Sequence, residues 1–406
     1  MTVASVEPQI AKSQGTTPVT RGYVAAMKVL VVSTPGLGHL KPLVPLVRAF
    51  LARGDQVVVA SGVDLKPTVE AIGAELFAVG HGEDAWMDQL RQRTRGVPGD
   101  GIAPERILHY FVPRVFAEIA AADMIDGVLD CGRRLAPDLV LFENLALAGP
   151  LAADVLGVPG VNHLLGPLTD HEVFELANDA VSPMWRSFGR DVPGYAGVYR
   201  DLTIEICPPS LERLKVPSGE VLSLRPAPLP EAPATRSSRP LVYVTFGTFF
   251  SYDLEIFRPV LEGLAEEPID VVVTVGSDRD PAALAPFPAN TRVERFIPQA
   301  ELLPRCDAVV HHGGAGTTFG ALAHGLPQLV IPQGADNFTH AAMVDQAGDG
   351  LVLLPGEATP TTIRNAVRRI LAEPTYAAAA RRTADEIAVM AGPAEVAEAL
   401  RSYAHR

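Results

Sequence analysis

The strongest constraint on the fold is a strand–turn–helix–strand unit in the last third of the chain. Residues 308–310 are a short apolar, valine-rich run, which is typical of a buried parallel strand. The segment 312–318, HGGAGTT, follows, and residues 319–324 then have a helical pattern that stops at Gly325. A second apolar run at 329–331 completes a βαβ unit. Such units predict an α/β chain, in which a parallel sheet is covered by helices.

The turn of this unit has the chemistry of a phosphate site. It lies at the start of a helix, where unpaired N–H groups and the helix dipole favour an anion. Its glycines allow close backbone approach, and His312, Thr317 and Thr318 supply further donors. A turn whose glycines only permit tight packing is the alternative. We disfavour it because a second polar loop follows the next strand, so both loops meet at one edge.

A second unit of the same kind opens the folded part of the chain. Residues 28–33 read as a strand, 40–53 as a helix and 56–60 as the next strand. The turn between them carries G-x-G, but Lys41 occupies the place of the third glycine of a dinucleotide fingerprint. A nicotinamide or flavin site is therefore not expected. His39 stands at the mouth of the first strand instead, and a purely local hydrogen bond is the alternative to a catalytic role.

Length and composition predict two domains. The chain has 406 residues, and the βα alternation restarts at residue 241 after a proline-rich stretch at 216–240, which we interpret as a linker. Residues 1–26 are rich in Thr, Ser, Gln and Pro and read as a disordered extension. A net charge of −13 argues against general nucleic-acid binding. Three scattered cysteines and the lack of a long apolar run favour a cytoplasmic protein without a membrane span.

Together these motifs resemble the glycosyltransferases related to plant and macrolide UDP- and TDP-sugar transferases. The resemblance covers nearly the whole chain from Met27 onward. It implies an α/β fold of two Rossmann-like domains facing across a cleft, the GT-B fold. Residues 27–215 would bind the acceptor and residues 241–375 the nucleotide sugar. Residues 376–406 would form terminal helices that cross back to the N-terminal domain.

The resemblance assigns a catalytic pair. In this family the base is the His of a G-H-x-x-P turn, which matches G-H-L-K-P at 38–42, so His39 would be the base. An acidic residue after the strand at 137–142 pairs with that His. It is usually Asp, and here the match is Glu143. A carboxylate would fix the tautomer of the imidazole and stabilise its protonated form. A solvated loop residue is the alternative for Glu143.

The same resemblance assigns the diphosphate of the donor to the glycine-rich turn. His312 and Thr317 match the residues that hold the phosphates, with the backbone at Gly314 and Gly316 between them. Thr248, after the first strand of the second half, matches a small hydroxyl residue that also reaches the phosphates.

A further motif would bind the base of the donor. F-I-P-Q, which comprises Phe296, Ile297 and Gln299, matches a W-x-P-Q motif whose aromatic residue stacks on the base. Phe offers the same π face as Trp; a core aromatic at a strand end is the alternative.

Two departures from the family bear on the donor. Asp336-Asn337 stands where the family commonly has D/E-Q, which holds sugar hydroxyls, and Asn is the shorter amide. Gly320 stands where plant members often carry a Glu that binds ribose. Both departures favour a dTDP-deoxysugar over UDP-glucose.

The predicted activity is inverting, metal-independent sugar transfer from a nucleotide diphosphate to a hydroxyl of a small hydrophobic natural product. No cofactor is expected beyond the dTDP- or UDP-sugar co-substrate. The alternatives are a UDP-glucose-dependent enzyme, a nucleotide-sugar 2-epimerase and an inactive partner of another transferase. The sequence leaves open the acceptor, the sugar, a homodimeric state and any need for an activator protein.

Overall fold

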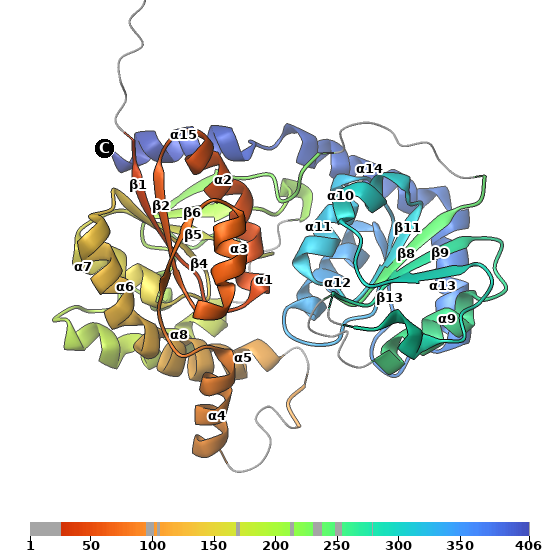
Figure 1. Ribbon diagram of the computed structural model, residues 1–406, viewed down its shortest axis with the longest axis horizontal. Coiled ribbons are helices and arrows are strands. Elements are labelled where there is room, and N and C mark those ends of the chain that lie inside the picture. The colour runs from red at the N-terminus through yellow and green to blue at the C-terminus, as the bar shows by residue number, and fades with distance from the viewer. Residues whose placement is uncertain are drawn as a thin grey trace, which may run out of the picture.

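The chain folds around two parallel β-sheets that lie side by side (Figure 1). The computed structural model describes residues 26–94, 101–103, 106–167, 171–211, 215–229, 238–247, 254–277 and 279–405. The predicted extension at 1–26 therefore lies almost wholly outside the described residues, and so does Thr248. Within the described ranges, no helix is both long and apolar enough to cross a membrane.

The N-terminal sheet has seven strands among the described residues, all paired in parallel in the order β3-β2-β1-β4-β5-β6-β7. Its central strands are apolar on both faces, as parallel strands covered by helices must be. The strands are β1 Lys28–Val32, β2 Gln56–Ser61, β3 Glu75–Ala78, β4 Leu139–Glu143, β5 Gly160–His163, β6 Leu202–Glu205 and β7 Glu220–Ser223.

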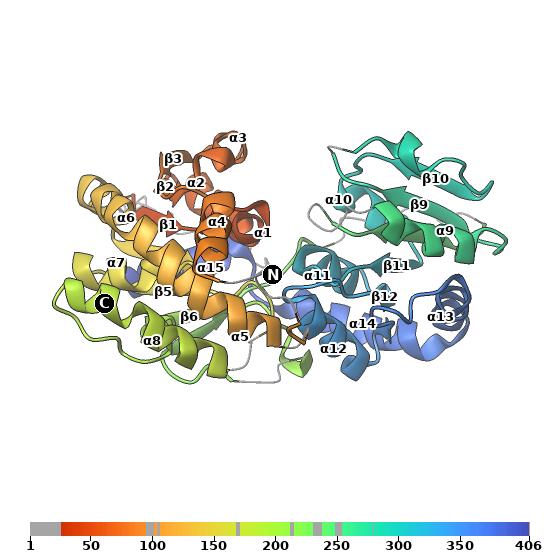
Figure 2. The same ribbon diagram turned by 90° about the horizontal axis from the view of Figure 1, so that it is seen from below.

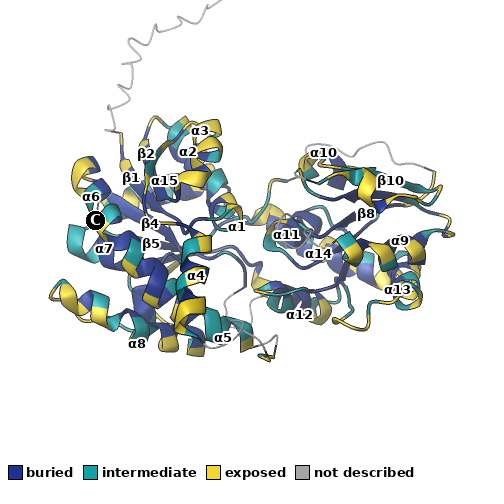
Figure 3. Cartoon of the chain, turned by 60° about the horizontal axis from the view of Figure 1, so that its bottom comes forward, coloured by how far each residue is buried: buried dark blue, intermediate teal, exposed yellow. Residues whose placement is uncertain are grey.

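Helices cover both faces of this sheet. Helices α6, α7 and α8 bury their apolar stripes on one face, and α2 packs on the other (Figure 3). The α-helices of this half are α1 Leu37–Leu40, α2 Val44–Ala52, α3 Lys66–Ala71, α4 Glu83–Arg93, α5 Ile107–Phe111, α6 Ala122–Leu135, α7 Ala148–Leu156 and α8 His171–Ser187. A π-helical segment, η4 Val112–Ala121, joins α5 to α6.

The C-terminal sheet has six described strands, again all parallel, in the order β10-β9-β8-β11-β12-β13. The strands are β8 Leu241–Thr245, β9 Asp270–Thr274, β10 Thr291–Glu294, β11 Ala308–His311, β12 Gln328–Val330 and β13 Gly350–Val352. Helices α9 and α13 cover one face, α10, α11 and α12 cover the other, and α14 packs on α11 (Figure 2).

The C-terminal half also supplies the last helix of the N-terminal half. Helix α15 leaves the second domain and packs on α2, where Arg401 pairs with the buried Asp55 and Arg53 pairs with Glu398 (Figure 1). The α-helices of this half are α9 Arg258–Leu264, α10 Gln299–Leu302, α11 Ala315–Ala323, α12 Asn337–Ala347, α13 Pro360–Ala372, α14 Pro374–Val389 and α15 Pro393–Ala404. Short 3₁₀ turns are η1 Lys41–Leu43, η2 Val63–Leu65, η5 Tyr195–Gly197, η6 Pro209–Leu211, η8 Leu254–Phe257, η9 Pro281–Leu284 and η10 Leu303–Arg305.

The predicted linker at 216–240 is wrong in its first part. Residues 220–223 form β7, which pairs with β6 over its full length and extends the N-terminal sheet. Pro217 precedes this strand and the next proline, Pro226, follows it, so the proline content marked the linker but not its start. The connection out of the N-terminal domain therefore begins after Ser223, and Arg225 N–H then donates to the carbonyl of Ala391 on the returning crossover.

Candidate active site

The carboxyl ends of β1 and β4 bring the predicted catalytic residues together. The two strands pair in register, with Val32 opposite Phe142, so the turn after β1 meets the last residue of β4. Gly36 in that turn has φ 138°, a conformation that side chains disfavour. The turn then enters α1, the short helix that carries His39.

His39 and Glu143 are in direct contact. Nδ1 of His39 lies 3.2 Å from Oε1 of Glu143, within ion-pair distance. The His39 side chain is 23% exposed, whereas Glu143 is fully buried. Nδ1 is the covered nitrogen of the imidazole. Nε2 is therefore the nitrogen available to a substrate hydroxyl.

Glu143 is held from three further directions. Its Oε1 accepts hydrogen bonds from the backbone N–H of Thr34 at 3.1 Å and from the Thr34 hydroxyl at 2.7 Å. Its Oε2 accepts from the N–H of Leu145 at 2.7 Å. A buried carboxylate needs such donors to stay ionised. The alternative of a solvated Glu143 is thus wrong, because its side chain has no exposed surface.

The pair sets its own protonation. Burial alone would lower the pKa of His39, but the charge of Glu143 and its hydrogen bond outweigh burial and raise that pKa above 6.5. Burial would raise the pKa of Glu143, and His39, Thr34 and the Leu145 N–H together lower it. An ionised Glu143 beside an easily protonated His39 is the arrangement that a general base requires.

Two neighbours of this pair were not predicted from the sequence. Phe116, on the π-helical segment η4, lies against the imidazole of His39 with ring centroids 5.7 Å apart. His163 stands in register with Glu143 on the adjacent strand β5, and burial lowers its pKa to about 4, which keeps it neutral. A polar residue at the end of a buried strand was the available signal for His163. No sequence signal of this kind marked Phe116, because a π-helical segment has no characteristic pattern.

The glycine-rich turn lies at the start of α11 in the second domain. The helix begins at Ala315, earlier than the predicted 319, with Gly314 in an extended N-cap conformation. Gly316, in the first turn of the helix, is exposed, whereas the N–H groups of Thr317 and Thr318 already donate to the carbonyl of Gly314. A nine-residue helix with an exposed first turn is suited to bind a diphosphate.

His312 is fixed beside this helix start by two glycines. A Cβ at Gly247 would lie 2.6 Å from Cε1 of His312, and one at Gly314 would lie 2.5 Å from Nε2. Neither position can hold a larger residue unless the imidazole moves. Burial lowers the pKa of His312 to about 4, despite the attraction of Asp336. His312 is therefore neutral, and it can still donate one N–H to a phosphate oxygen.

The base-binding motif is tied to the same helix. Nε2 of Gln299 donates to the hydroxyl of Thr317 at 2.9 Å, and Thr317 is otherwise buried. Phe296 is 63% exposed, which rules out the core-aromatic alternative. Ile297 is half-buried against the core and supports this loop from beneath. An exposed aromatic ring on a supported loop is free to stack on a base.

The two members of the expected sugar-binding motif differ in their placement. The Asp336 side chain is 41% exposed, whereas Asn337 is 2% exposed. In the amide orientation that satisfies its hydrogen bonds, Nδ2 of Asn337 donates to the carbonyls of Gly334 at 3.0 Å and His312 at 3.2 Å. Asn337 thus holds the donor loops together. Its contact with the sugar stays a prediction that this placement does not favour.

The two domains meet at this site. The charge of Asp336, from the second domain, contributes to the raised pKa of His39 in the first. Close by, the backbone of Gly166 packs on the ring of His340 in α12, where a Cβ would lie 2.6 Å from Nε2. The predicted catalytic pair and the Asp336 loop beside the glycine-rich turn therefore form one composite site.

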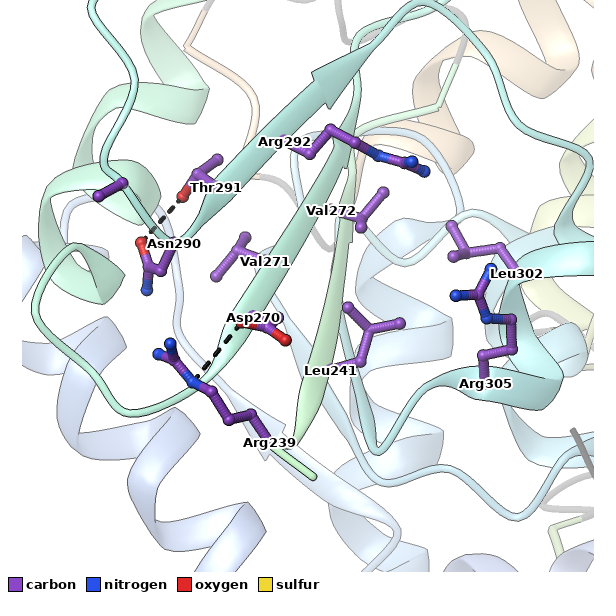
Figure 4. A pocket seen from close by; sticks show the side chains of 11 residues that line it. Arg239, Leu241, Asp270, Val271, Val272, Asn290, Thr291, Arg292, Leu302 and Arg305 are labelled. Atoms are coloured by element: carbon purple, nitrogen blue, oxygen red, sulfur yellow. Dashed lines mark hydrogen bonds and ion pairs between the residues drawn. The ribbon is translucent and has the colours of Figure 1, made fainter. Parts of the chain in front are cut away.

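Among the described residues, no group of three or more His, Cys, Asp or Glu side chains is arranged to hold a metal ion. A shallow pocket exists at the amino ends of β8, β9 and β10, where Arg239 faces Asp270 at 3.6 Å (Figure 4). This is the sheet edge opposite to the glycine-rich turn, so the pocket is separate from the composite site.

Fold and site define a class. Two parallel α/β domains with a His–carboxylate pair on one and a diphosphate-type turn on the other are the features of a GT-B glycosyltransferase. Solved structures agree: glycosyltransferase SsfS6 of Streptomyces sp. SF2575, complexed with thymidine diphosphate, superposes with a TM-score of 0.75 at 27% identity, covering 93% of this chain and 99% of that one.

Family comparison is more specific. Residues 108–218 match the N-terminal domain and residues 258–403 the C-terminal domain of the Erythromycin biosynthesis protein CIII-like model. The chain belongs to this family of glycosyltransferases. It is 34% identical to L-demethylnoviosyl transferase of Streptomyces niveus over 92% of this chain and 97% of the relative. It is 32% identical to 10-deoxymethynolide desosaminyltransferase of Streptomyces venezuelae over 89% and 93%.

Proposed function

We propose that this glycosyltransferase moves a deoxysugar from a dTDP donor to a hydroxyl of a hydrophobic natural-product aglycone, with inversion and without a metal ion. The observation that carries the proposal is the His39–Glu143 contact beside the Asp336 loop and the glycine-rich turn. An acceptor base and a leaving-group site on opposite domains are what direct sugar transfer needs.

The chemistry follows from this placement. Nε2 of His39 takes the proton of the acceptor hydroxyl. The resulting imidazolium is stabilised by Glu143, which faces its Nδ1. The acceptor oxygen bonds to the anomeric carbon, and the bond from that carbon to the diphosphate oxygen breaks. A direct displacement inverts the anomeric centre. His312 and the N–H groups at the start of α11 stabilise the negative charge that collects on the departing dTDP.

Support for a thymidine nucleotide comes from α11. Gly320 is buried, and a Cβ there would lie 3.1 Å from Leu303 and 3.4 Å from Gln299. A Glu at this position would press on the loop that carries the base-binding motif. The helix therefore offers no carboxylate to the 2′-hydroxyl of a ribose. This suits the deoxyribose of a thymidine nucleotide, which lacks that hydroxyl. The thymidine diphosphate of SsfS6 and the desosaminyl and noviosyl transferases among the relatives point the same way.

Support for a hydrophobic acceptor comes from the surroundings of His39. Phe116 contacts its ring, and Leu108, Tyr110 and Phe111 on α5 are only partly buried. Helix α5 packs on the π-helical segment that carries Phe116, and its partly exposed apolar side chains are available to line a site for an apolar acceptor.

The test is a product assay. The protein is incubated with dTDP- and UDP-sugars and a panel of polyketide aglycones, and the products are identified by mass spectrometry. We expect an aglycone that gains one sugar, with dTDP released. An unmodified aglycone together with an epimerised sugar, either free or still attached to the nucleotide, would support the 2-epimerase alternative. No product across the panel, together with no shift in melting temperature on adding donors, would support an inactive partner protein.

A further inference from the structure

The residue before His312 has a bonding pattern of its own. His311 is the last residue of β11 and has no exposed surface. Its Nδ1 accepts a hydrogen bond from the N–H of Gly313 at 3.0 Å, and its Nε2 lies 2.7 Å from Oε1 of Gln328 on β12. Both nitrogens of a buried imidazole are therefore used, one toward the glycine-rich turn and one toward the sheet.

These two contacts fix the tautomer. A backbone N–H can only donate, so Nδ1 of His311 must be the unprotonated nitrogen. The single proton of the neutral imidazole then lies on Nε2, and Gln328 must accept it through its oxygen. Burial and the neighbouring His312 lower the pKa of His311 to about 3, so this arrangement holds across the neutral range.

The contact to Gly313 acts where the turn is most constrained. Gly313 has φ 92°, and a Cβ there would lie 2.8 Å from the carbonyl of Asn337. Asn337 also contacts the turn through its side chain, whose amide donates to the carbonyl of His312. The turn is thus held from the sheet by His311 and from the following loop by Asn337.

We propose that His311 is a positioning residue for the diphosphate turn, and that the Gln328–His311–Gly313 chain sets the place from which His312 and the first N–H groups of α11 meet the donor diphosphate. This inference rests on the proposed function. It assigns His311 no contact with substrate. The proposal predicts that nucleotide binding depends on Nδ1 of His311 as a hydrogen-bond acceptor. A ring of similar volume without this acceptor should not support full nucleotide affinity.

Two substitutions separate positioning from packing. His311→Phe keeps a ring in the core but removes the acceptor, which leaves the Gly313 N–H buried and unpaired. His311→Asn loses ring volume, yet its side-chain oxygen can accept from an N–H two residues on, as in an Asx turn. A packing role predicts that Phe is tolerated better than Asn. The positioning role predicts the reverse order for nucleotide binding.

The experiment is calorimetric titration of wild-type and variant proteins with dTDP and with UDP, alongside thermal unfolding. We expect His311→Phe to weaken dTDP binding about tenfold, which corresponds to the loss of one net hydrogen bond. The dTDP affinity of His311→Asn should remain within about threefold of the wild type. Unchanged dTDP binding by a folded His311→Phe variant, with weaker binding by His311→Asn, would overturn the proposal. Binding of neither nucleotide by the wild type would instead contradict the proposed function.

A second pair keeps the test open should His311→Phe not fold. Gln328→Glu retains an acceptor for the Nε2 proton, whereas Gln328→Leu removes it and leaves the imidazole free to change tautomer. We expect dTDP affinity to fall several-fold in Gln328→Leu and to be retained better in Gln328→Glu. Equal affinity in both variants and the wild type would show that the chain does not position the turn.

Discussion

Nδ1 of His39 and Oε1 of Glu143 lie 3.2 Å apart, although His39 lies on α1, after β1, and Glu143 is the last residue of β4. The parallel pairing of β1 with β4 creates this contact, and Thr34 and Leu145 hold the carboxylate in place. The fully buried carboxylate of Glu143 faces the covered Nδ1 of His39, whose side chain is only partly exposed, and this leaves Nε2 for the acceptor.

Removing the base should abolish most of the turnover. We expect His39→Ala to lower kcat by roughly 10²–10⁴-fold, with the affinity for dTDP nearly unchanged because the donor contacts lie on the other domain. Glu143→Gln should cost less, since Thr34 still orients its oxygen. His81→Ala is a histidine control, because His81 is exposed and pairs with Asp123 instead of Glu143. Wild-type kcat in His39→Ala would end the assignment.

The pH profile should report the His39–Glu143 pair. The base works only when unprotonated, and its pKa is raised, so kcat/KM should increase with pH through a midpoint above 6.5. In Glu143→Gln the attraction of the carboxylate is lost while burial remains. The midpoint should then move to lower pH, even though the maximal rate falls. A midpoint that stays in place in this variant would show that another group titrates.

Chelation should leave the enzyme active. The charge of the leaving diphosphate is assigned to His312 and the N–H groups of α11, which need no metal. We therefore expect the rate to persist in excess EDTA and to be unaffected when Mg²⁺ is restored. A rate that vanishes with EDTA and returns with Mg²⁺ or Mn²⁺ would require a different account of phosphate stabilisation.

Phe296 should contribute to nucleotide affinity through stacking. Stacking of a base on an aromatic ring is worth about 1–3 kcal/mol, so Phe296→Ala should weaken dTDP binding by roughly tenfold or more. Phe296→Trp should preserve the affinity. Phe287 is also exposed, at 39%, but belongs to no predicted motif, so Phe287→Ala serves as the control. Equal losses in the two alanine variants would argue against stacking at Phe296.

The elements that the sequence predicted best are those with strong local patterns. The apolar runs of β1 and β11 and the glycines that follow them are dictated by burial on two faces and by close backbone approach. The roles of His39, Glu143 and His312 were expected from the family resemblance, and each of these residues lies at or shortly after the carboxyl end of a strand, where polar side chains of α/β sheets gather. The start of the linker could not, because β7 is a short, half-exposed edge strand without a clear alternation.

Other residues depend on contacts that no local pattern encodes. Asn337 matched a sugar-binding motif by position, yet α12 turns its side chain inward to the carbonyl of His312. His311 was indistinguishable from its neighbour until the pairing of β11 with β12 placed Gln328 at its Nε2. Phe116 reaches His39 only through a π-helical segment. In each case tertiary geometry decides the role of the side chain.

The choice of donor tests the central claim most directly. With Asn337 facing inward, the preference for a dTDP-deoxysugar rests on Gly320 and α11, and on the relatives. The decisive measurement is a competition in which a dTDP-6-deoxyhexose and UDP-glucose are offered together with one acceptor, and the two glycosides are quantified. The account predicts a higher kcat/KM for the dTDP-deoxysugar and a product whose anomeric centre is inverted. A higher kcat/KM for UDP-glucose, or a product that retains the configuration of the donor, would contradict it.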